Sequence, residues 1–212
     1  MPYLLIFIGC LGITISIVGL NNPYIQHFDI ASLAWMDGHR TPFSNGINVF
    51  LSHIGGLPSM LIICSLWCIT LYQSKQFTQI LFISFSLLGG SALGWFLKWF
   101  FDRARPDAIY ALTETYGASF PSAHSIYATV LSCIIIFIFH KHAYARIILF
   151  LACLWFLGMG ISRVYLGAHY PTDVLAGWSI ALVWVSFLWL YFSPSQISKN
   201  KLFLEKNLNE VE

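Results

Sequence analysis

A short polar stretch, Ser162–Asp173, lies between two long apolar segments and carries side chains suited to phosphoryl chemistry. Charged groups taken out of water need compensation, so an arginine, a histidine and a carboxylate in this setting indicate a site. We predict that Arg163 binds a phosphate and that His169 attacks it. Asp173 follows the histidine by four residues. We predict that this carboxylate holds the imidazole in the tautomer that leaves one ring nitrogen free to attack.

Further cations follow the apolar segment that ends at Leu97. Lys98 comes directly after this segment, and Arg105 comes seven residues later. A phosphate monoester is a dianion, and burying it requires cations and N–H donors that replace its lost solvation. We therefore predict that Lys98, Arg105 and Arg163 all bind the phosphate. The same cations would stabilise the charge on the equatorial oxygens during transfer.

A Pro-Ser-Ala-His sequence, Pro121–His124, opens another apolar segment. Starting a helix at this proline places the next three residues in its first turn, where free backbone N–H groups and the helix dipole favour an anion. We predict that the Ser122 hydroxyl and the Ala123 amide donate hydrogen bonds to the phosphate. His124 is the predicted general acid that protonates the leaving alkoxide. Each feature alone also fits a snorkelling cation or a helix cap, so their meeting at one place carries the prediction.

The composition is that of an integral membrane protein. The chain has 212 residues, of which 58% are hydrophobic and 9% are charged, whereas soluble domains carry about 25% charged residues. The formal charge of +2, without a basic run and interleaved aromatics, argues against a nucleic-acid partner. The five cysteines all lie in apolar segments, so neither a disulfide framework nor a zinc site is expected.

Six apolar segments are predicted to span the membrane, since a crossing helix needs about 17 to 25 mostly apolar residues. They are Tyr3–Leu20, Leu57–Tyr72, Phe77–Leu97, Pro121–Phe139, Tyr144–Ile161 and Val174–Phe192. Between the first two, Asn21–Gly56 is too polar to span and predicts an interfacial helix. The predicted fold is thus an all-α polytopic bundle of six transmembrane helices plus this interfacial helix. Residues 1–192 form one transmembrane domain, and residues 193–212 form a polar cytoplasmic tail.

The distribution of cations predicts the orientation. With six crossings, both termini share one side with two short turns, and that side carries Lys75, Lys141, Arg146, Lys199, Lys201 and Lys206. The other side carries Arg40, Lys98, Arg103, Arg105 and Arg163, of which the last four belong to the predicted site. Since cytoplasmic loops are enriched in lysine and arginine, we expect cytoplasmic termini and a site that faces outward. In a bacterium this means the inner membrane and its periplasmic face.

The three polar clusters resemble the three signature motifs of the type-2 phosphatidic acid phosphatase superfamily, the membrane lipid phosphate phosphatases. Residues 98–106 match its lysine, six-spacer, Arg-Pro motif, residues 121–124 resemble Pro-Ser-Gly-His, and residues 162–173 match the third motif. Ala123 stands where the family pattern has glycine. An alanine keeps the N–H donor, but it adds a methyl group near the phosphate and removes access to positive φ.

The resemblance implies a metal-independent phosphatase that has no cofactor and forms a phosphohistidine at His169, which water then hydrolyses. It also implies the roles predicted above for six other residues: His124 and Asp173 in catalysis, and Lys98, Arg105, Ser122 and Arg163 in phosphate binding. The expected substrate is polyprenyl diphosphate, phosphatidylglycerophosphate, phosphatidic acid or a lipid A phosphate. Two alternatives stay open: phosphotransfer to another lipid, and a non-catalytic lipid-phosphate binder or transporter. The sequence does not indicate an oligomeric state.

Overall fold

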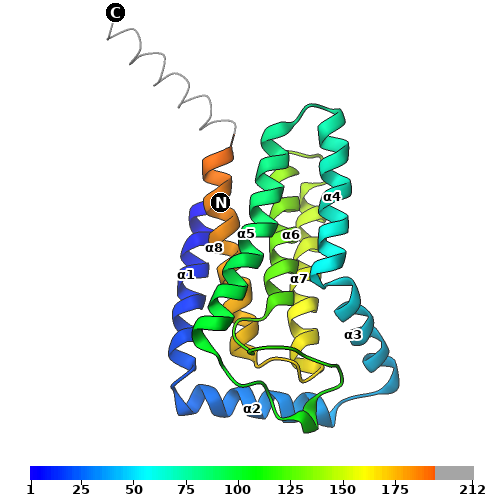
Figure 1. Cartoon of the computed structure of the whole chain (residues 1–212). Coiled ribbons are helices and arrows are strands. Elements are labelled where there is room, and N and C mark those ends of the chain that lie inside the picture. The colour runs from blue at the N-terminus through cyan, green and yellow to red at the C-terminus, as the bar shows by residue number, and fades with distance from the viewer. Residues whose placement is uncertain (194–212) are drawn as a thin grey trace, which may run out of the picture.

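The structure, a computed structural model, describes residues 1–193, and all regular elements in that range are helices (Figure 1). Its elements are α1 (Pro2–Gly19), α2 (Pro23–Gly38), α3 (Pro42–Ile54), α4 (Leu57–Gln73), α5 (Phe77–Phe101), a 3-10 turn η1 (Ala108–Tyr110), α6 (Ala123–Ile138), α7 (Ala145–Tyr165) and α8 (Pro171–Phe192). The all-α prediction is confirmed for this part of the chain. Residues 194–212 of the predicted tail lie outside it.

Helix α8 lies at the centre of the bundle. It packs against α1, α5, α6 and α7, and its contact with α1 is the most extensive. Close approach of these two helices depends on small residues, because a Cβ added at Gly12 would collide with the Ser179 hydroxyl. Figure 1 shows the loop between α5 and α6 at the same end of the bundle as α2, away from the N-terminus. The polar loops are thus gathered at one end.

Four or five crossings are supported by helix length and composition, so the predicted count of six is not confirmed. By length and composition, α1, α5, α7 and α8 can each cross a membrane, and the bent pair α3 and α4, with 54° between them, can count as a fifth crossing. Helix α6 has only 16 residues. It is shorter than predicted because it begins at Ala123 and not at Pro121. Ser122 keeps an extended backbone and caps the helix by accepting from the Ser125 amide.

The segment predicted as one interfacial helix forms two helices. Both α2 and α3 begin with a proline after a capping residue, Asn22 and Thr41 respectively, and this pattern ends one helix and starts the next. Helix α2 crosses the end of the bundle (Figure 1) and contacts α1, α7 and α8. Its Asp29 is fully buried. The segment is therefore a structural part of the bundle end that carries the polar loops.

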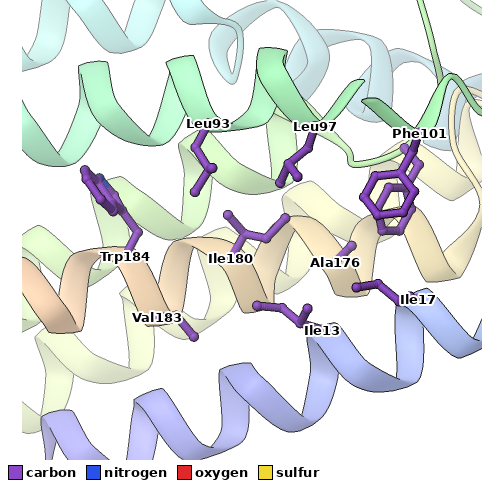
Figure 2. Close-up of a pocket in the computed structure, with 10 residues that line it drawn as sticks. Ile13, Ile17, Leu93, Leu97, Phe101, Ala176, Ile180, Val183 and Trp184 are labelled. Carbon is purple, nitrogen blue, oxygen red and sulfur yellow. The ribbon is translucent and has the colours of Figure 1, made fainter. Parts of the chain in front are cut away.

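An apolar groove lies between α1, α5 and α8 (Figure 2). It has a volume of about 190 Å³ and is lined by ten aliphatic and aromatic residues: Ile13, Ile17, Leu93, Leu97, Phe101, Phe120, Ala176, Ile180, Val183 and Trp184. None of the residues with predicted chemistry lines it. Residues with predicted chemistry lie instead at the end of the bundle, where a larger cavity opens.

Candidate active site

A cavity of about 850 Å³ opens at the bundle end where the polar loops gather. Six of the eight predicted site residues line it: Lys98, Arg105, Ala123, His124, Arg163 and His169. They come from α5, the loop after it, α6, α7 and the loop before α8. The structure thus brings together residues that are up to 71 positions apart, counted from Lys98 to His169. Asp173 and Ser122 are fully buried and do not belong to the lining.

The His169 imidazole presents its two nitrogens to two different partners. Its Nδ1 lies 3.5 Å from Oδ2 of Asp173, and its Nε2 lies 3.4 Å from Nη1 of Arg105. A hydrogen on Nδ1 satisfies the carboxylate and leaves the Nε2 lone pair on the cavity side. The spacing of four residues therefore produces the pairing expected from the sequence, because Asp173 lies in the first turn of α8 and the histidine lies just before it.

The pKa of His169 is lowered to about 4, chiefly because burial disfavours the charged imidazolium. The nearby Asp173 carboxylate raises this pKa, and the cations Lys98 and Arg105 lower it further. The net direction keeps the imidazole neutral at pH 7. A neutral imidazole with a free Nε2 lone pair is the nucleophilic form.

Three hydrogen-bond donors besides the histidine hold the Asp173 carboxylate. Its Oδ2 accepts from the Ser119 hydroxyl at 2.5 Å and from the Tyr170 amide at 3.0 Å, while its Oδ1 accepts from Arg103 Nη1 at 2.6 Å. The bond from Tyr170 is half of a capping box at the start of α8. Neither Ser119 nor Arg103 was assigned a role from sequence. The position of Arg103, two residues before Arg105 in the same polar loop, was the available signal.

Main-chain carbonyl groups hold two of the three predicted phosphate-binding cations. Lys98 Nζ donates to the Ala118 carbonyl at 2.6 Å, and Arg105 donates to the carbonyls of Ala168, Tyr116 and Gly117 at 2.7 to 2.8 Å. Burial lowers the pKa of Arg105. Carbonyl oxygens orient these cations without neutralising their charge. An incoming anion would therefore meet cations that are already placed.

Arg163 is the third cation and is almost completely buried, with 2% of its surface exposed. It donates to two hydroxyl groups, Ser52 Oγ at 2.7 Å and Ser162 Oγ at 3.0 Å. Within residues 1–193, neither Arg163 nor the other two cavity cations lies within 4.0 Å of a carboxylate oxygen. In the same range, no group of three or more His, Cys, Asp and Glu side chains is placed to hold a metal ion. The three cavity cations are therefore not ion-paired in this range, although two carboxylates, Asp102 and Glu114, also line the cavity.

His124 and Ser122 differ in how they relate to the cavity. His124 lines it, and its Nε2 lies 3.2 Å from the Ser52 carbonyl oxygen. Ser122 instead turns inward, where its Oγ accepts from the Ser125 hydroxyl at 2.9 Å. The sequence placed both in one exposed helical turn, and the correction follows from Ser122 being the buried cap of α6. Ser52 on α3 contacts both Arg163 and His124, and no motif marked it.

Ala123 occupies its position without backbone strain. Among residues 1–193, the only non-glycine residues with positive φ are Lys75 and Asp102. Ala123 is the first residue of α6; it lines the cavity and also packs against the hydrophobic core. The conformational freedom of glycine is thus not required here. The extra methyl group is the one remaining difference from the family pattern.

Comparisons with known proteins identify the family of this chain. A family model described as the PAP2 superfamily matches residues 79–197. Phosphatidylglycerophosphatase B of Bacillus subtilis (strain 168) is 30% identical over 152 residues, which cover 68% of this chain and 73% of that protein. Undecaprenyl-diphosphatase BcrC of the same organism is 25% identical over 159 residues, covering 73% of this chain and 78% of that protein.

A solved structure is similar over nearly the whole chain. The crystal structure of the first transmembrane PAP2 type phosphatidylglycerolphosphate phosphatase from Bacillus subtilis superposes with a TM-score of 0.75 and 26% sequence identity. The match covers 90% of this chain and 94% of that chain, so it extends well beyond the residues matched by the family model.

Proposed function

Because the chain belongs to the PAP2 superfamily, we propose that it is a membrane lipid phosphatase whose reaction passes through a phosphohistidine at His169. The observation that carries this proposal is the placement of one imidazole between a carboxylate and a cationic cavity. Its Nδ1 faces Asp173, its Nε2 faces Arg105, and Lys98 and Arg163 line the same cavity. This arrangement suits nucleophilic attack on a bound phosphate.

In the first half of the reaction, the three cations bind the phosphate oxygens, and the Ala123 amide at the start of α6 donates a further hydrogen bond. The Nε2 atom of His169 attacks phosphorus while the bond from phosphorus to the lipid oxygen breaks. His124 protonates that leaving oxygen, and Asp173 stabilises the positive imidazole. No metal ion is needed in this scheme, because Lys98, Arg105 and Arg163 offset the charge of the phosphoryl group.

In the second half, water attacks the phosphohistidine. His124, which has lost its proton, accepts one from the water, and the bond from Nε2 to phosphorus breaks. Inorganic phosphate leaves and His169 returns to its neutral form. Ser122 contributes by capping α6 and thereby fixing the positions of Ala123 and His124. Its role in phosphate binding would be indirect.

The substrate is a lipid with a terminal phosphate or diphosphate. Two relatives are named for phosphatidylglycerophosphate and undecaprenyl diphosphate. We include phosphatidic acid and lipid A phosphates, because the cavity recognises the phosphate group that all of these share. The test is release of inorganic phosphate by the purified full-length chain in detergent, with a chelator present, from each lipid of this panel. Folded protein that releases none from any of them would support a binder or transporter instead.

For the membrane arrangement, we propose that α6 is a sixth crossing and that the cavity faces outward. Residues Ser125 to Ile134 are all buried among α5, α7 and α8, so this helix needs less apolar length than one that faces lipid. Tyr116 is 80% exposed beside the cavity, and Lys75 lies in the turn between α4 and α5. In intact cells, an impermeant thiol reagent should modify Tyr116→Cys, and it should modify Lys75→Cys only after lysis. The reverse pattern would invert the proposed orientation.

A further inference from the structure

Two charged residues next to the cavity, one buried and one partly buried, have no part in the reaction scheme. Asp29 lies on α2 and is fully buried, and Arg103 lies in the loop after α5 with 15% of its side chain exposed. Neither lines the cavity. Burying a carboxylate costs free energy unless it is paired and hydrogen-bonded. The contacts of Asp29 and Arg103 therefore indicate which parts of the structure the pair holds in place.

Asp29 caps the helix that carries Asp173. Its Oδ1 accepts from the Thr172 amide at 3.0 Å, and its Oδ2 accepts from the Thr172 hydroxyl at 2.5 Å. Thr172 is the second residue of α8, directly before Asp173. Asp29 thus satisfies an amide that has no carbonyl partner within its own helix. It joins α2 to the first turn of α8.

Arg103 bridges the two carboxylates. Its Nη2 lies 2.8 Å from Asp29 Oδ2, and its Nη1 lies 2.6 Å from Asp173 Oδ1. The guanidinium carbon also lies 4.1 Å from the centre of the Tyr170 ring. A planar guanidinium with two donors on different carboxylates fixes both groups in direction, which a lysine cannot do. With Oδ1 of Asp173 held by Arg103, Oδ2 is the oxygen that faces the imidazole, and it also accepts from the Ser119 hydroxyl and the Tyr170 amide.

We propose that Arg103 and Asp29 are positioning residues for the nucleophile: together they hold Asp173 so that its Oδ2 faces His169 Nδ1. The inference rests on the proposed role of His169. It assigns a function to α2, whose Asp29 touches no residue of the cavity yet fixes the helix turn that orients the nucleophile. The two arginines of the same loop then have separate tasks, since Arg105 lies in the cavity and Arg103 lies behind it.

The kinetic test compares Arg103→Gln and Asp29→Asn with a matched control, Asp37→Asn. Asp37 lies on the same helix, 45% exposed, and pairs with Arg40. Loss of orientation without loss of substrate contacts should lower kcat and leave KM unchanged. We expect kcat to fall about 100-fold in Arg103→Gln and about 10-fold in Asp29→Asn. Asp37→Asn should keep the kcat of the wild type. The substrates are phosphatidylglycerophosphate and a polyprenyl diphosphate.

The second readout is the titration of His169, followed by NMR of its ring and assigned by the missing signal in His169→Asn. The charged and titratable groups that act on this ring are Asp173, Lys98, Arg105 and His124. The contact with Asp173 raises the pKa of His169, so loss of that contact in Arg103→Gln should lower the pKa. If Asp173 stays in place, loss of the nearby Arg103 charge should raise the pKa of His169 instead, and that result would contradict a positioning role.

The outcomes separate this inference from the proposed function. If the wild type releases no phosphate from any lipid, the function fails, yet the His169 titration still tests the contact through Arg103. If the wild type is active, a folded Arg103→Gln with wild-type kcat and an unchanged His169 pKa overturns the inference. Should Arg103→Gln fail to fold, Arg103→Lys and Asp29→Asn decide. We expect reduced kcat in both, and wild-type kcat in both would overturn the inference.

Discussion

The two sides of the His169 ring differ in how they use arginine. On the cavity side, Arg105 is held by backbone carbonyls and lies 3.4 Å from Nε2. On the opposite side, Arg103 is bonded to the carboxylates of Asp29 and Asp173. The two arginines are two residues apart in the chain. Their tasks differ because one has its charge compensated and the other does not.

The hydrogen-bonding partners of a cation indicate whether it is free to bind an anion. A cation whose charge is matched by carboxylates is fixed in place and serves the architecture. One that is oriented by neutral carbonyls keeps its charge for an anion. Lys98 and Arg163 belong to the second kind, since their partners are carbonyl and hydroxyl groups. We therefore expect the residues on the cavity side to bind the anion and those on the far side to position the nucleophile.

The largest expected effect follows from removing His169, whose ring lies between the two sides. His169→Ala should abolish turnover, with a decrease in kcat on the order of 10⁶-fold, because the covalent route is removed. Binding of a phosphate analogue should persist, since the three cations are untouched. Phosphate release measures the first, and thermal stabilisation by inorganic phosphate measures the second. Substantial activity in a folded His169→Ala would remove this residue from the nucleophile role.

Arg105→Gln removes the arginine on the cavity side of the ring and is the counterpart of Arg103→Gln. Removing a cavity cation should lower kcat/KM by about 10³-fold, because a donor to the transition-state charge is lost. Unlike Arg103→Gln, it should also raise KM and weaken thermal stabilisation by inorganic phosphate. The same binding curve on both variants distinguishes the two sides of the ring. Equal effects on phosphate binding would contradict the division between binding and positioning.

The pH dependence of the wild type reports the balance between the two sides. Burial and the cavity cations lower the pKa of His169 to about 4, against the opposing effect of Asp173. A lowered pKa keeps the nucleophile neutral as the pH falls below the ordinary histidine range of about 6.5. The value of kcat/KM, corrected for ionisation of the lipid phosphate, should therefore stay high to about pH 5 and fall near pH 4. A decline centred near 6.5 would contradict the predicted environment.

The smallest expected effect belongs to Ala123, where the chain departs from the family pattern. Ala123→Gly restores the pattern, but the residue is already helical and unstrained. We expect phosphate release close to that of the wild type and a loss of about 1 kcal/mol or less in stability, because glycine is a poorer helix former. A marked gain in kcat/KM would show that the methyl group obstructs the phosphate on the cavity side.

Hydropathy and residue spacing in the sequence sufficed to predict the helical class, the membrane location, and the pairing of His169 with Asp173. These features depend on local properties: the transfer of apolar side chains out of water, and the geometry of one helix turn. The ends of α5, α6, α7 and α8 were also expected to meet, because alternating crossings place them on the same face. The cavity lining includes residues from each of these regions.

The polar residues that pack behind the site could be identified only from the folded arrangement of the helices. Asp29 bonds to Thr172 across 143 positions of the chain, and Ser52 bonds to Arg163 across 111. In the sequence, both lie in a segment whose polarity suggested the membrane interface. The folded chain buries Asp29 and turns Ser122 inward, because packing α2 and α6 against α8 sets which polar atoms are left to pair. Such pairings depend on the relative placement of distant helices, and no local pattern specifies that placement.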